Sequence, residues 1–571
     1  MPDKATVELI KRSLIYTAEE MGVALRRSAY SPNIRERADH SCAVLDSYGR
    51  TIGQAEHIPV HLGSLPVGLR NTLQYLEREE VELEEGDVVI VNDPYISGTH
   101  LNDITLIQPV FHRGELVAYA ANKAHHSDVG GASPASISAD ADEIHQEGIV
   151  IPPTKLVRRG KTSREVLEMI TRNVRMPSIT LGDLHAQLAA NTLGARNIAE
   201  IINRYGAKTF LEACSEILDQ TEKAVRLEYE RMPEGEYVGE DYLETISARE
   251  ERPARIAVKV SISPKRIEMD FSGTEKQVKG PVNTVYGVTV AASMFAVRSI
   301  LSHHVEVNDG FYRTVRVYAP EGCMLNACWP AAVSAGNVET SQRIVDAIYR
   351  ALSHAVPDRI PAAAHGSMTN LMMGGVHPRT GERWAFYETI GGGYGGRLGK
   401  DGVDGIHVNM TNTLNTPIEV IELYYPVIFN TYSLRPDSMG HGEFRGGCGI
   451  ERSFTALAEI DVTIVGERSR IAPWGLWGGT GAKPSEYLVQ RGSGEVIRLS
   501  SKARTRLSPG DRLIIRTAGG GGYGEPRRRS RERVLRDLQY GLISREIAER
   551  VYGVEGYSVS TSSTTRAALS T

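Results

Sequence analysis

The sequence contains few cysteines, and none of them stands in a recognisable pairing motif. The five cysteines are odd in number and scattered along the chain: Cys42, Cys214, Cys323, Cys328 and Cys448. A disulfide framework needs an even set of cysteines at regular spacings, and a thiolate zinc site needs close pairs such as CxxC. The cysteines therefore indicate neither kind of site.

Long hydrophobic runs and a strong excess of one charge are also absent. The most apolar stretch, residues 287–301, contains Arg298 and is too short to span a membrane. Residues 1–20 carry charges throughout, which is not typical of a signal peptide. A net charge of −5 gives no electrostatic reason to bind nucleic acid or an anionic membrane. We expect a cytoplasmic protein that binds neither.

Glycine is abundant, with 56 residues in a chain of 571, and many of the glycines are clustered. Clustered glycines predict tight loops and close backbone approaches. Apolar residues at three- and four-residue steps predict helices at 5–30 and 181–204, whereas shorter runs predict strands at 88–91, 104–111, 116–121 and 254–262. The predicted fold class is α+β (mixed α/β) and multi-domain, because one core rarely organises a chain of this length.

Changes in composition along the chain predict the domain boundaries. We expect an N-terminal α/β domain at 1–232, a central α/β domain at 233–384, a glycine-rich, β-dominated domain at 385–526, a C-terminal helical pair at 527–554 and a disordered tail at 555–571. The tail is assigned from its many serines and threonines.

The most informative segment is 92–131, which reads NDPYISGTHLND, a strand, a turn, a second strand and NKAHHSDVGG. A turn centred on Arg113 and Gly114 places Asp103 opposite Ala124, with His125 beside it. His100, three residues before Asp103, folds over the same end of the hairpin. Two imidazoles and one carboxylate can hold a divalent ion with open coordination positions, and such an ion can activate water. The pattern therefore predicts a hairpin-built metal site in the N-terminal domain.

Other polar residues are candidates for roles around this site. His126 points to the opposite sheet face from His125 and, like Asp128, is better placed for a supporting or acid–base role than as a ligand. Asp128 and Glu147 are candidates for positioning or deprotonating water, although loop salt bridges and caps are an equal alternative.

The candidates for substrate binding are His57, His61, Asp93, Asn337 and Glu339. His57 and His61 flank Pro59, which makes a helix there improbable, so we expect an extended strand with both imidazoles on one face. Buried core histidines are the alternative interpretation. On the helix at 181–204, a polar stripe of Asp183, Gln187 and Asn191 is typical of a solvated or interhelical face, and the alternative is that it lines the substrate cavity.

Two stretches fit the pattern GxGxxG: Gly391, Gly393 and Gly396, and Gly519, Gly521 and Gly524. Neither opens an apolar helix, so the dinucleotide-binding context is missing and structural loops are expected. We find no nucleotide site in the sequence.

Several longer motifs make the chain recognisable. They are SPNIRERADHSCAVLD, HIPVHLGSLP, NDPYISGTHLNDI, AHHSDVGG, HQEGIVIPP, DFSGT, NVETSQR, ETIGGGYGGRLGKDG, MTNTLNTPIEVIE, FRGGCGIER and AGGGGYGEP. With these motifs the chain resembles hydantoinase B, the partner of hydantoinase A, in the group that includes 5-oxoprolinase and the alpha subunit of acetone carboxylase. In relatives, the His and Asp of GTHLND and the first His of AHH bind the metal. The corresponding residues are His100, Asp103 and His125.

The resemblance implies an ATP-dependent hydrolase of cyclic amides such as lactams and hydantoins. A hydantoinase A-like partner subunit would bind ATP and phosphorylate the lactam oxygen, and this chain would hydrolyse the activated compound with one divalent ion (Mn, Fe or Zn). The assembly would be a hetero-oligomer. Two alternatives stay open: an alpha-type subunit of an ATP-dependent ketone carboxylase, and a non-catalytic scaffold that binds a metal structurally.

Overall fold

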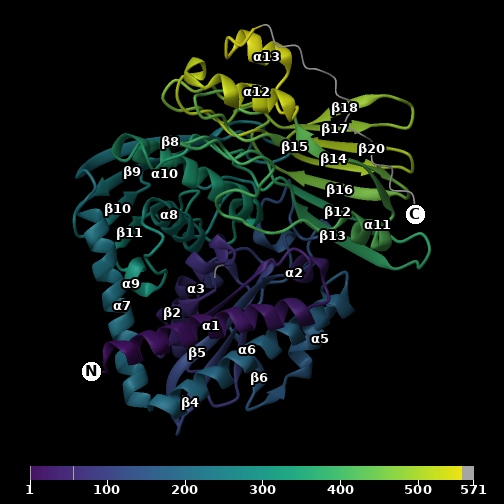
Figure 1. The fold of residues 1–571 in the computed structure, drawn as a ribbon. Helices are drawn as coiled ribbons and strands as arrows, with labels where there is room; N and C mark the ends of the chain where they lie inside the picture. Colours follow the sequence, from purple (N-terminus) through teal and green to yellow (C-terminus); the bar gives the residue numbers. More distant parts are fainter. Residues whose placement is uncertain (1, 56, 556–571) are drawn as a thin grey trace, which may run out of the picture.

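The computed structural model describes residues 2–55 and 57–555 (Figure 1). Within these ranges the strands form four sheets, and helices pack against the first two. This arrangement confirms the expected mixed α and β class. No helix in the described ranges is long and apolar enough to cross a membrane.

The N-terminal part is built on a seven-stranded antiparallel sheet with the order β2-β1-β5-β4-β3-β6-β7. Its strands are β1 (His40–Asp46), β2 (Thr51–Gln54), β3 (Val88–Val91), β4 (Asp103–His112), β5 (Glu115–His125), β6 (Thr154–Arg158) and β7 (Lys161–Thr162). The accompanying helices are α1 (Lys4–Ser28), α2 (Pro32–Arg35), α3 (Pro59–Arg78), α4 (Pro94–Ser97), α5 (Arg164–Arg172), α6 (Pro177–Tyr205) and α7 (Ala207–Tyr229).

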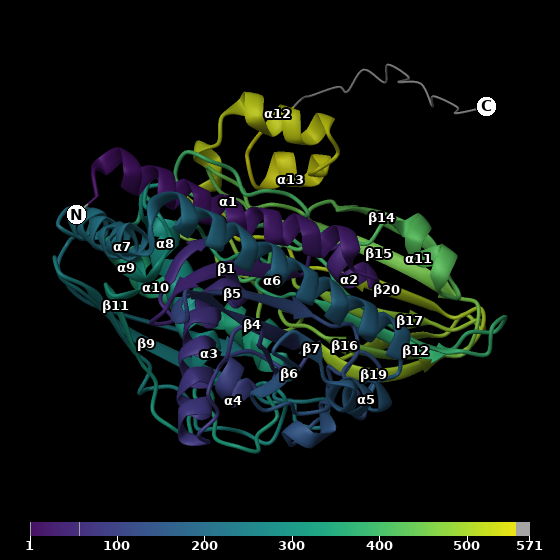
Figure 2. The ribbon, with the colours of Figure 1, turned by 90° about the horizontal axis from the view of Figure 1, so that it is seen from below.

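Both faces of this sheet are covered, as the side chains of β1 show. Cys42 and Val44 pack in one core with residues of α1, α6 and α7, whereas Ala43 and Leu45 pack in another with residues of α3. The alternation follows from the two-residue period of a strand. Figure 2 shows α1 and α6 running side by side across the first of these faces. The burial of both faces explains why the strands read as continuous apolar runs.

The central part consists of a four-stranded sheet and two buried helices. The sheet has the order β11-β10-β9-β8, with β8 (Gly235–Leu243), β9 (Ala254–Ile262), β10 (Ile267–Asp270) and β11 (Val315–Tyr318). The helices are α8 (Tyr286–Ile300) and α10 (Ser341–Ala355), with the short α9 (Asp309–Tyr312) between them. A π-helical turn, Gly336–Thr340, leads directly into α10. The expected strand at 254–262 is confirmed.

The C-terminal part consists of two further sheets that share one hydrophobic core. One has the order β13-β12-β16-β19 and the other β14-β15-β20-β17-β18. Their bounds are β12 (Asn370–Val376), β13 (Arg383–Thr389), β14 (Val427–Arg435), β15 (Gly449–Ala456), β16 (Ile460–Val465), β17 (Glu486–Gln490), β18 (Val496–Leu499), β19 (Lys502–Leu507) and β20 (Arg512–Arg516), with α11 at Ile418–Tyr424. The boundary expected at 384/385 falls inside β13, so this sheet structure begins with β12.

The chain ends in two short helices, α12 (Arg531–Gln539) and α13 (Arg545–Arg550). Gly541 has the left-handed φ of 69°, and the Ser544 side chain caps α13 by accepting the Ile547 N–H. Of the expected tail, residues 556–571 lie outside the described residues.

The two GxGxxG stretches lie against each other. The N–H of Gly393 donates to the carbonyl oxygen of Ala518 at 3.1 Å, and the N–H of Gly396 donates to that of Gly521 at 2.8 Å. An added Cβ at Gly393 would overlap the carbonyl oxygen of Gly447. The glycines therefore permit backbone-to-backbone packing, as expected for structural loops.

Candidate metal centre

The hairpin of β4 and β5 pairs Asp103 directly with His125. The sequence pattern predicted Ala124 as the partner, and that register is wrong by one residue. The expected pairing does hold beside the turn, where His112 faces Glu115, but a bulge between Val110 and Phe111 shifts the rest. Residues directly opposite in an antiparallel pair share a sheet face, so the shift brings both side chains to the same point.

His100 reaches this point from the loop before β4. Gly98 ends α4 in the left-handed conformation, with φ of 84°, and turns the chain back over the sheet. The N–H of Asp103 donates to the carbonyl oxygen of His100 at 3.1 Å, and the Asn102 amide donates to that of His126 at 3.0 Å. These bonds hold the loop against the end of the hairpin.

Three side-chain atoms converge there. The distances are 3.1 Å between His100 Nε2 and Asp103 Oδ1, 3.2 Å between His100 Nε2 and His125 Nδ1, and 3.3 Å between His125 Nδ1 and Asp103 Oδ1. Ligands about 2.1 Å from one ion lie about 3.0 Å apart at right angles and about 3.4 Å apart at tetrahedral angles. The observed spacings fall within this range, so the three atoms can occupy one face of a coordination sphere.

The charge state of the cluster suits a cation. Burial raises the pKa of Asp103, but the neighbouring His100 and His61 hold it well below its usual value, so the group is a carboxylate. Burial lowers the pKa of His125, which favours the neutral imidazole that a metal requires. Among the described residues, the buried Asp103 Oδ2 has no hydrogen-bond partner. An unpaired buried carboxylate oxygen costs free energy that a bound cation would offset.

The structure contradicts the expected strand around Pro59. Pro59 instead lies in the first turn of α3, where a missing N–H costs nothing and the fixed φ suits a helix. His61 is therefore helical, and its Nε2 lies 3.3 Å from Asp103 Oδ1. His57 precedes the helix, and its Nδ1 accepts the N–H of Cys42 at 3.2 Å. The two imidazoles do not share a strand face, and only His61 contacts the cluster.

His126 faces away from the cluster, as expected from strand alternation. Its Nε2 lies 2.9 Å from Gln187 Oε1 on α6. The polar stripe on α6 was expected on a solvated or interhelical face, which is wrong for Gln187 and Asn191, because both face the sheet. Gln187 and Asn191 are buried and bond the Asn122 side chain on β5, while Asp183 accepts the N–H groups of Tyr30 and Ser31.

The two candidate water-activating carboxylates are engaged elsewhere. Asp128 accepts N–H groups from Gly130 and Ala135 and pairs with the Arg175 guanidinium at 2.8 Å. Glu147 accepts the N–H groups of Val333 and Ser334 and the Ser334 hydroxyl. These contacts are those of loop anchors, which was the alternative interpretation of both residues.

The remaining candidates for substrate binding also have structural partners. Asp93 caps α4 by accepting the N–H of Tyr95 at 3.0 Å. Asn337 and Glu339 lie in the π-helical turn, and Glu339 Oε1 accepts the N–H of Met368 and the Asn370 amide. Their role in substrate binding stays a prediction.

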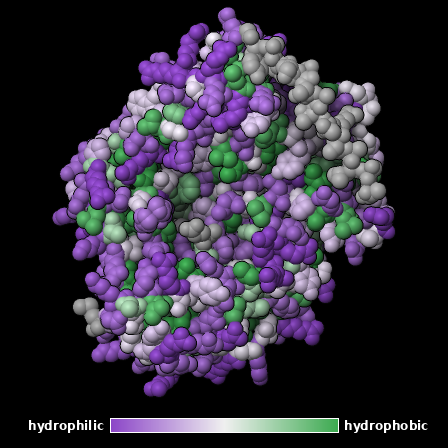
Figure 3. Space-filling view, in the orientation of Figure 1, coloured by the Kyte–Doolittle hydropathy of each residue, from purple (hydrophilic) through white to green (hydrophobic). Residues whose placement is uncertain are grey.

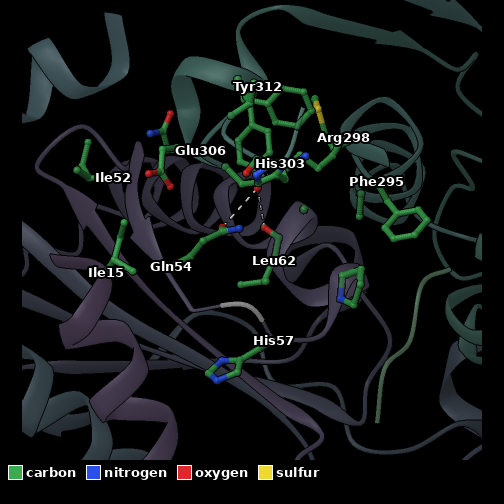
Figure 4. Close-up of a pocket in the computed structure, with 18 of the residues that line it drawn as sticks. Ile15, Ile52, Gln54, His57, Leu62, Phe295, Arg298, His303, Glu306 and Tyr312 are labelled. Atoms are coloured by element: carbon green, nitrogen blue, oxygen red, sulfur yellow. Dashed lines mark hydrogen bonds between the residues drawn. The ribbon is translucent and has the colours of Figure 1, made fainter. Parts of the chain in front are cut away.

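A cavity with a volume of about 520 Å³ lies beside the start of α3 (Figure 4). His57 lines it together with Ile15, Leu62 and Phe295, and the Tyr312 hydroxyl donates to Gln54 Oε1 at 3.5 Å at its wall. Its lining mixes apolar and charged side chains. The face of the molecule seen in Figure 3 likewise mixes hydrophilic and hydrophobic residues. The cavity and the His61–Asp103 contact both lie at the N-terminal end of α3.

Two residues near the cluster were missed in the sequence. The ring of Tyr387, on β13, stacks on the imidazole of His125, and the Arg37 guanidinium lies 4.9 Å from the centroid of the same tyrosine ring. Arg37 lies in the motif SPNIRERADHSCAVLD, and Tyr387 immediately precedes the motif ETIGGGYGGRLGKDG. No spacing rule connects β13 with the β4–β5 hairpin. Only the packing of the third sheet on the first brings them together.

Comparison with known proteins gives a consistent result. Residues 3–526 match the family model described as hydantoinase B/oxoprolinase. An uncharacterised protein of Methanocaldococcus jannaschii is 49% identical over 97% of this chain and 96% of its own length. The B-type subunit of a putative D-/L-hydantoinase from a Pseudomonas strain is 32% identical over 97% of this chain and 95% of its own length. The 5-oxoprolinase of Saccharomyces cerevisiae is 33% identical over 92% of this chain but only 42% of its own length.

Two solved structures share the fold. The ATP-dependent caprolactamase of Pseudomonas jessenii aligns with a TM-score of 0.89 at 29% identity and covers 97% of both chains. A nucleotide-free acetone carboxylase aligns with a TM-score of 0.90 at 18% identity, over 97% of this chain and 80% of that chain. The resemblance expected from the motifs is thus confirmed, and the chain belongs to the hydantoinase B/oxoprolinase family.

Proposed function

We propose that this chain is the metal-containing subunit of an ATP-dependent cyclic amide hydrolase, and that it hydrolyses a lactam or hydantoin that a partner subunit has activated by phosphorylation. The observation that carries the proposal is the convergence of His100 Nε2, Asp103 Oδ1 and His125 Nδ1 within 3.3 Å of one another at a fully buried point.

The relatives support a division of labour between two subunits. One relative is named as a single subunit of a hydantoinase, and this chain covers nearly all of it. The chain spans only about 40% of the eukaryotic 5-oxoprolinases that it matches. In those proteins the remaining length is available for the ATP-dependent step. A separate hydantoinase A-like subunit would supply that step here, in a hetero-oligomer.

The chemistry requires activation, because resonance stabilises a lactam amide against water. Transfer of the γ-phosphoryl group of ATP to the lactam oxygen in the partner would leave a carbon that accepts water more readily. Water then adds to that carbon, the ring nitrogen is protonated, and the ring C–N bond breaks to leave an acyl phosphate. A second water then adds to the acyl carbon and displaces phosphate, which leaves the ring-opened carboxylate. When bound by His100, Asp103 and His125, a divalent ion such as Mn, Fe or Zn would acidify water and offset developing negative charge.

The residues around the cluster orient these ligands. The Ser41 hydroxyl accepts the N–H of Ile58 and lies 3.4 Å from His61 Nδ1, to which it can donate. That contact holds the His61 ring, whose Nε2 lies 3.3 Å from Asp103 Oδ1. A neighbouring side chain that contacts a ligating carboxylate helps to fix its orientation. The burial of the whole group excludes bulk water from the site.

The test is reconstitution of the pair. The full chain is co-expressed with the ATP-binding subunit, and ADP release and ring opening are measured against lactams, hydantoins and, for the carboxylase alternative, ketones with bicarbonate. We expect turnover of a cyclic amide that the His100→Ala variant loses while still assembling with the partner. Turnover of ketones alone would contradict the proposal in favour of a carboxylase. Full turnover by His100→Ala would leave the metal cluster without a catalytic role.

A further inference from the structure

The aromatic ring of Tyr387 lies flat against the imidazole of His125, although the two residues belong to different sheets. Their ring centroids are 4.5 Å apart and the ring planes differ by 8°. Tyr387 comes from β13 of the third sheet and His125 from the end of β5 in the first. The contact therefore joins the C-terminal part of the chain to the N-terminal part, and one of its two rings belongs to the candidate metal centre.

His125 lacks the contact that usually orients a metal-binding histidine. Such a residue normally donates its second ring N–H to a carboxylate or carbonyl, which fixes both the tautomer and the plane of the ring. The Nδ1 atom of His125 faces Asp103. Its Nε2 atom is buried without a hydrogen-bond partner in the described part of the chain. Its backbone is held by Asp39 and Asn33, but those bonds leave the ring free to rotate about χ2. A parallel stack supplies the missing restraint on the ring plane.

Tyr387 is itself held in place at its far end. Its hydroxyl donates to Asn370 Oδ1 at 2.9 Å, and the Asn370 amide donates to Glu339 Oε1 at 2.7 Å and to the carbonyl oxygen of Val465 at 2.6 Å. The Arg37 guanidinium over the same ring donates to the backbone oxygen of Tyr387 at 3.3 Å. The phenol thus has a fixed orientation before any ion is bound.

We propose that Tyr387 is a positioning residue for the metal centre, which holds the His125 ring by stacking so that Nδ1 faces the ion. This inference rests on the proposed function, because it requires that His125 binds a metal. The hydroxyl bond to Asn370 serves to hold the phenol, and the ring face does the positioning. Loss of the ring should therefore matter more than loss of the hydroxyl.

The neighbouring Phe386 offers a matched control. Phe386 and Tyr387 are both buried aromatic residues of β13, but they point to opposite faces of the strand. Phe386 packs in the core shared by the two C-terminal sheets, at 5.0 Å from the ring of Tyr425. Replacing either residue with leucine removes a comparable ring from the same strand, but only the Tyr387 substitution removes the stack.

The experiment is a titration of the full chain with Mn²⁺ in competition with a chelator of known affinity. We expect the dissociation constant of Tyr387→Leu to rise about 10- to 100-fold, as is typical when a group that orients a ligand is lost. Phe386→Leu and Tyr387→Phe should stay within about threefold of wild type. The electron paramagnetic resonance spectrum of bound Mn²⁺ should change in Tyr387→Leu and be retained in Tyr387→Phe.

The possible outcomes separate the two proposals. If Tyr387→Leu binds Mn²⁺ as tightly as Phe386→Leu, the positioning role is overturned, while the metal site stands. If wild type binds no Mn²⁺, or binds it as well after His100→Ala, the metal site fails and the positioning role fails with it. If Tyr387→Leu does not fold, a crystal structure of Mn²⁺-loaded wild type decides. Parallel rings of His125 and Tyr387 support the role, and a rotated imidazole with Nε2 bonded elsewhere contradicts it.

Discussion

Asp103 and His125 are direct partners across the β4–β5 hairpin, with Asp103 Oδ1 3.3 Å from His125 Nδ1. Strand pairing alone therefore brings two of the three candidate ligands to one sheet face. Only His100 lies on a loop, and the turn at Gly98 brings this loop to the end of the hairpin. A site with this construction is rigid before an ion binds, which reduces the ordering cost of binding.

The first prediction concerns Asp103→Asn. An amide keeps the shape of the side chain but removes the negative charge, so we expect Mn²⁺ affinity to fall by on the order of 100-fold or more. A ligand that binds only the folded state stabilises it by about 2.7 kcal/mol at 100 times its dissociation constant. Wild type should gain this stability in thermal melts with Mn²⁺, and Asp103→Asn should not.

Asp93→Asn is the control for that experiment, because Asp93 lies in the same segment but caps α4. It should retain the Mn²⁺-dependent rise in melting temperature. An equal rise in Asp103→Asn would show that the ion binds elsewhere.

The second prediction separates anchoring from catalysis at Asp128. Its carboxylate is buried and accepts bonds from two loop N–H groups and from Arg175, so we expect Asp128→Ala to lower the free energy of unfolding by about 3 kcal/mol. Mn²⁺ affinity should stay within about threefold of wild type. Urea denaturation and the chelator titration measure the two quantities. A variant with normal stability that loses turnover in the reconstituted pair would instead support a role in activating water.

The third prediction concerns the packed glycine loops. Gly393→Ala forces a methyl group into the backbone of Gly447, so we expect a loss of stability of more than about 2 kcal/mol or failure to fold. Gly492→Ala is the control, because Gly492 is exposed and nothing lies within 4 Å of an added Cβ there. Its unfolding free energy should change by less than about 0.5 kcal/mol. Equal stability of the two variants in urea denaturation would contradict close packing of the loops.

The fourth prediction is a pH dependence of stability. Burial, with a further contribution from Glu467, raises the pKa of Glu339 to about 8, whereas an unfolded glutamate titrates near about 4.3. The folded chain thus holds a proton that the unfolded chain has lost. The stability from this group is fully present below about pH 4 and is lost as pH rises through about 8.

Glu339→Gln removes this titration but keeps an oxygen that can accept the bonds from Met368 and Asn370. Between about pH 6 and 8, the unfolding free energy of wild type should fall relative to the variant by up to about 1.4 kcal/mol per pH unit. Urea denaturation at three pH values measures the difference. Parallel slopes would mean that Glu339 is ionised in the folded protein.

Local sequence patterns predicted much of this structure because their causes are local. The amphipathic α1, the strands of the hairpin and the C-terminal helix pair follow from periodicity and capping residues. The errors have two different causes. Proline breaks a helix in its interior but is tolerated in the first turn, where Pro59 lies. The bulge beside Phe111 leaves no signal in the composition and moves the partner of Asp103 by one residue.

Contacts between distant segments could not be predicted in this way. His61 reaches Asp103 because α3 covers one face of the sheet, and Tyr387 reaches His125 because the third sheet packs on the first. The two glycine-rich stretches pack against each other through hydrogen bonds such as that between Gly393 and Ala518. Their structural role could therefore not be predicted from either stretch alone. Each of these relationships depends on tertiary packing rather than on spacing along the chain.

The central claim is most directly tested by the metal content of the purified protein. The full chain is stripped with a chelator, dialysed against Mn²⁺, Fe²⁺ or Zn²⁺, and assayed by elemental analysis beside His100→Ala and the exposed-histidine control His185→Ala. We predict about one ion per chain for wild type and His185→Ala with at least one of these metals, and almost none for His100→Ala. No tightly bound ion in wild type with any of the three, or the same content in His100→Ala, would contradict the account.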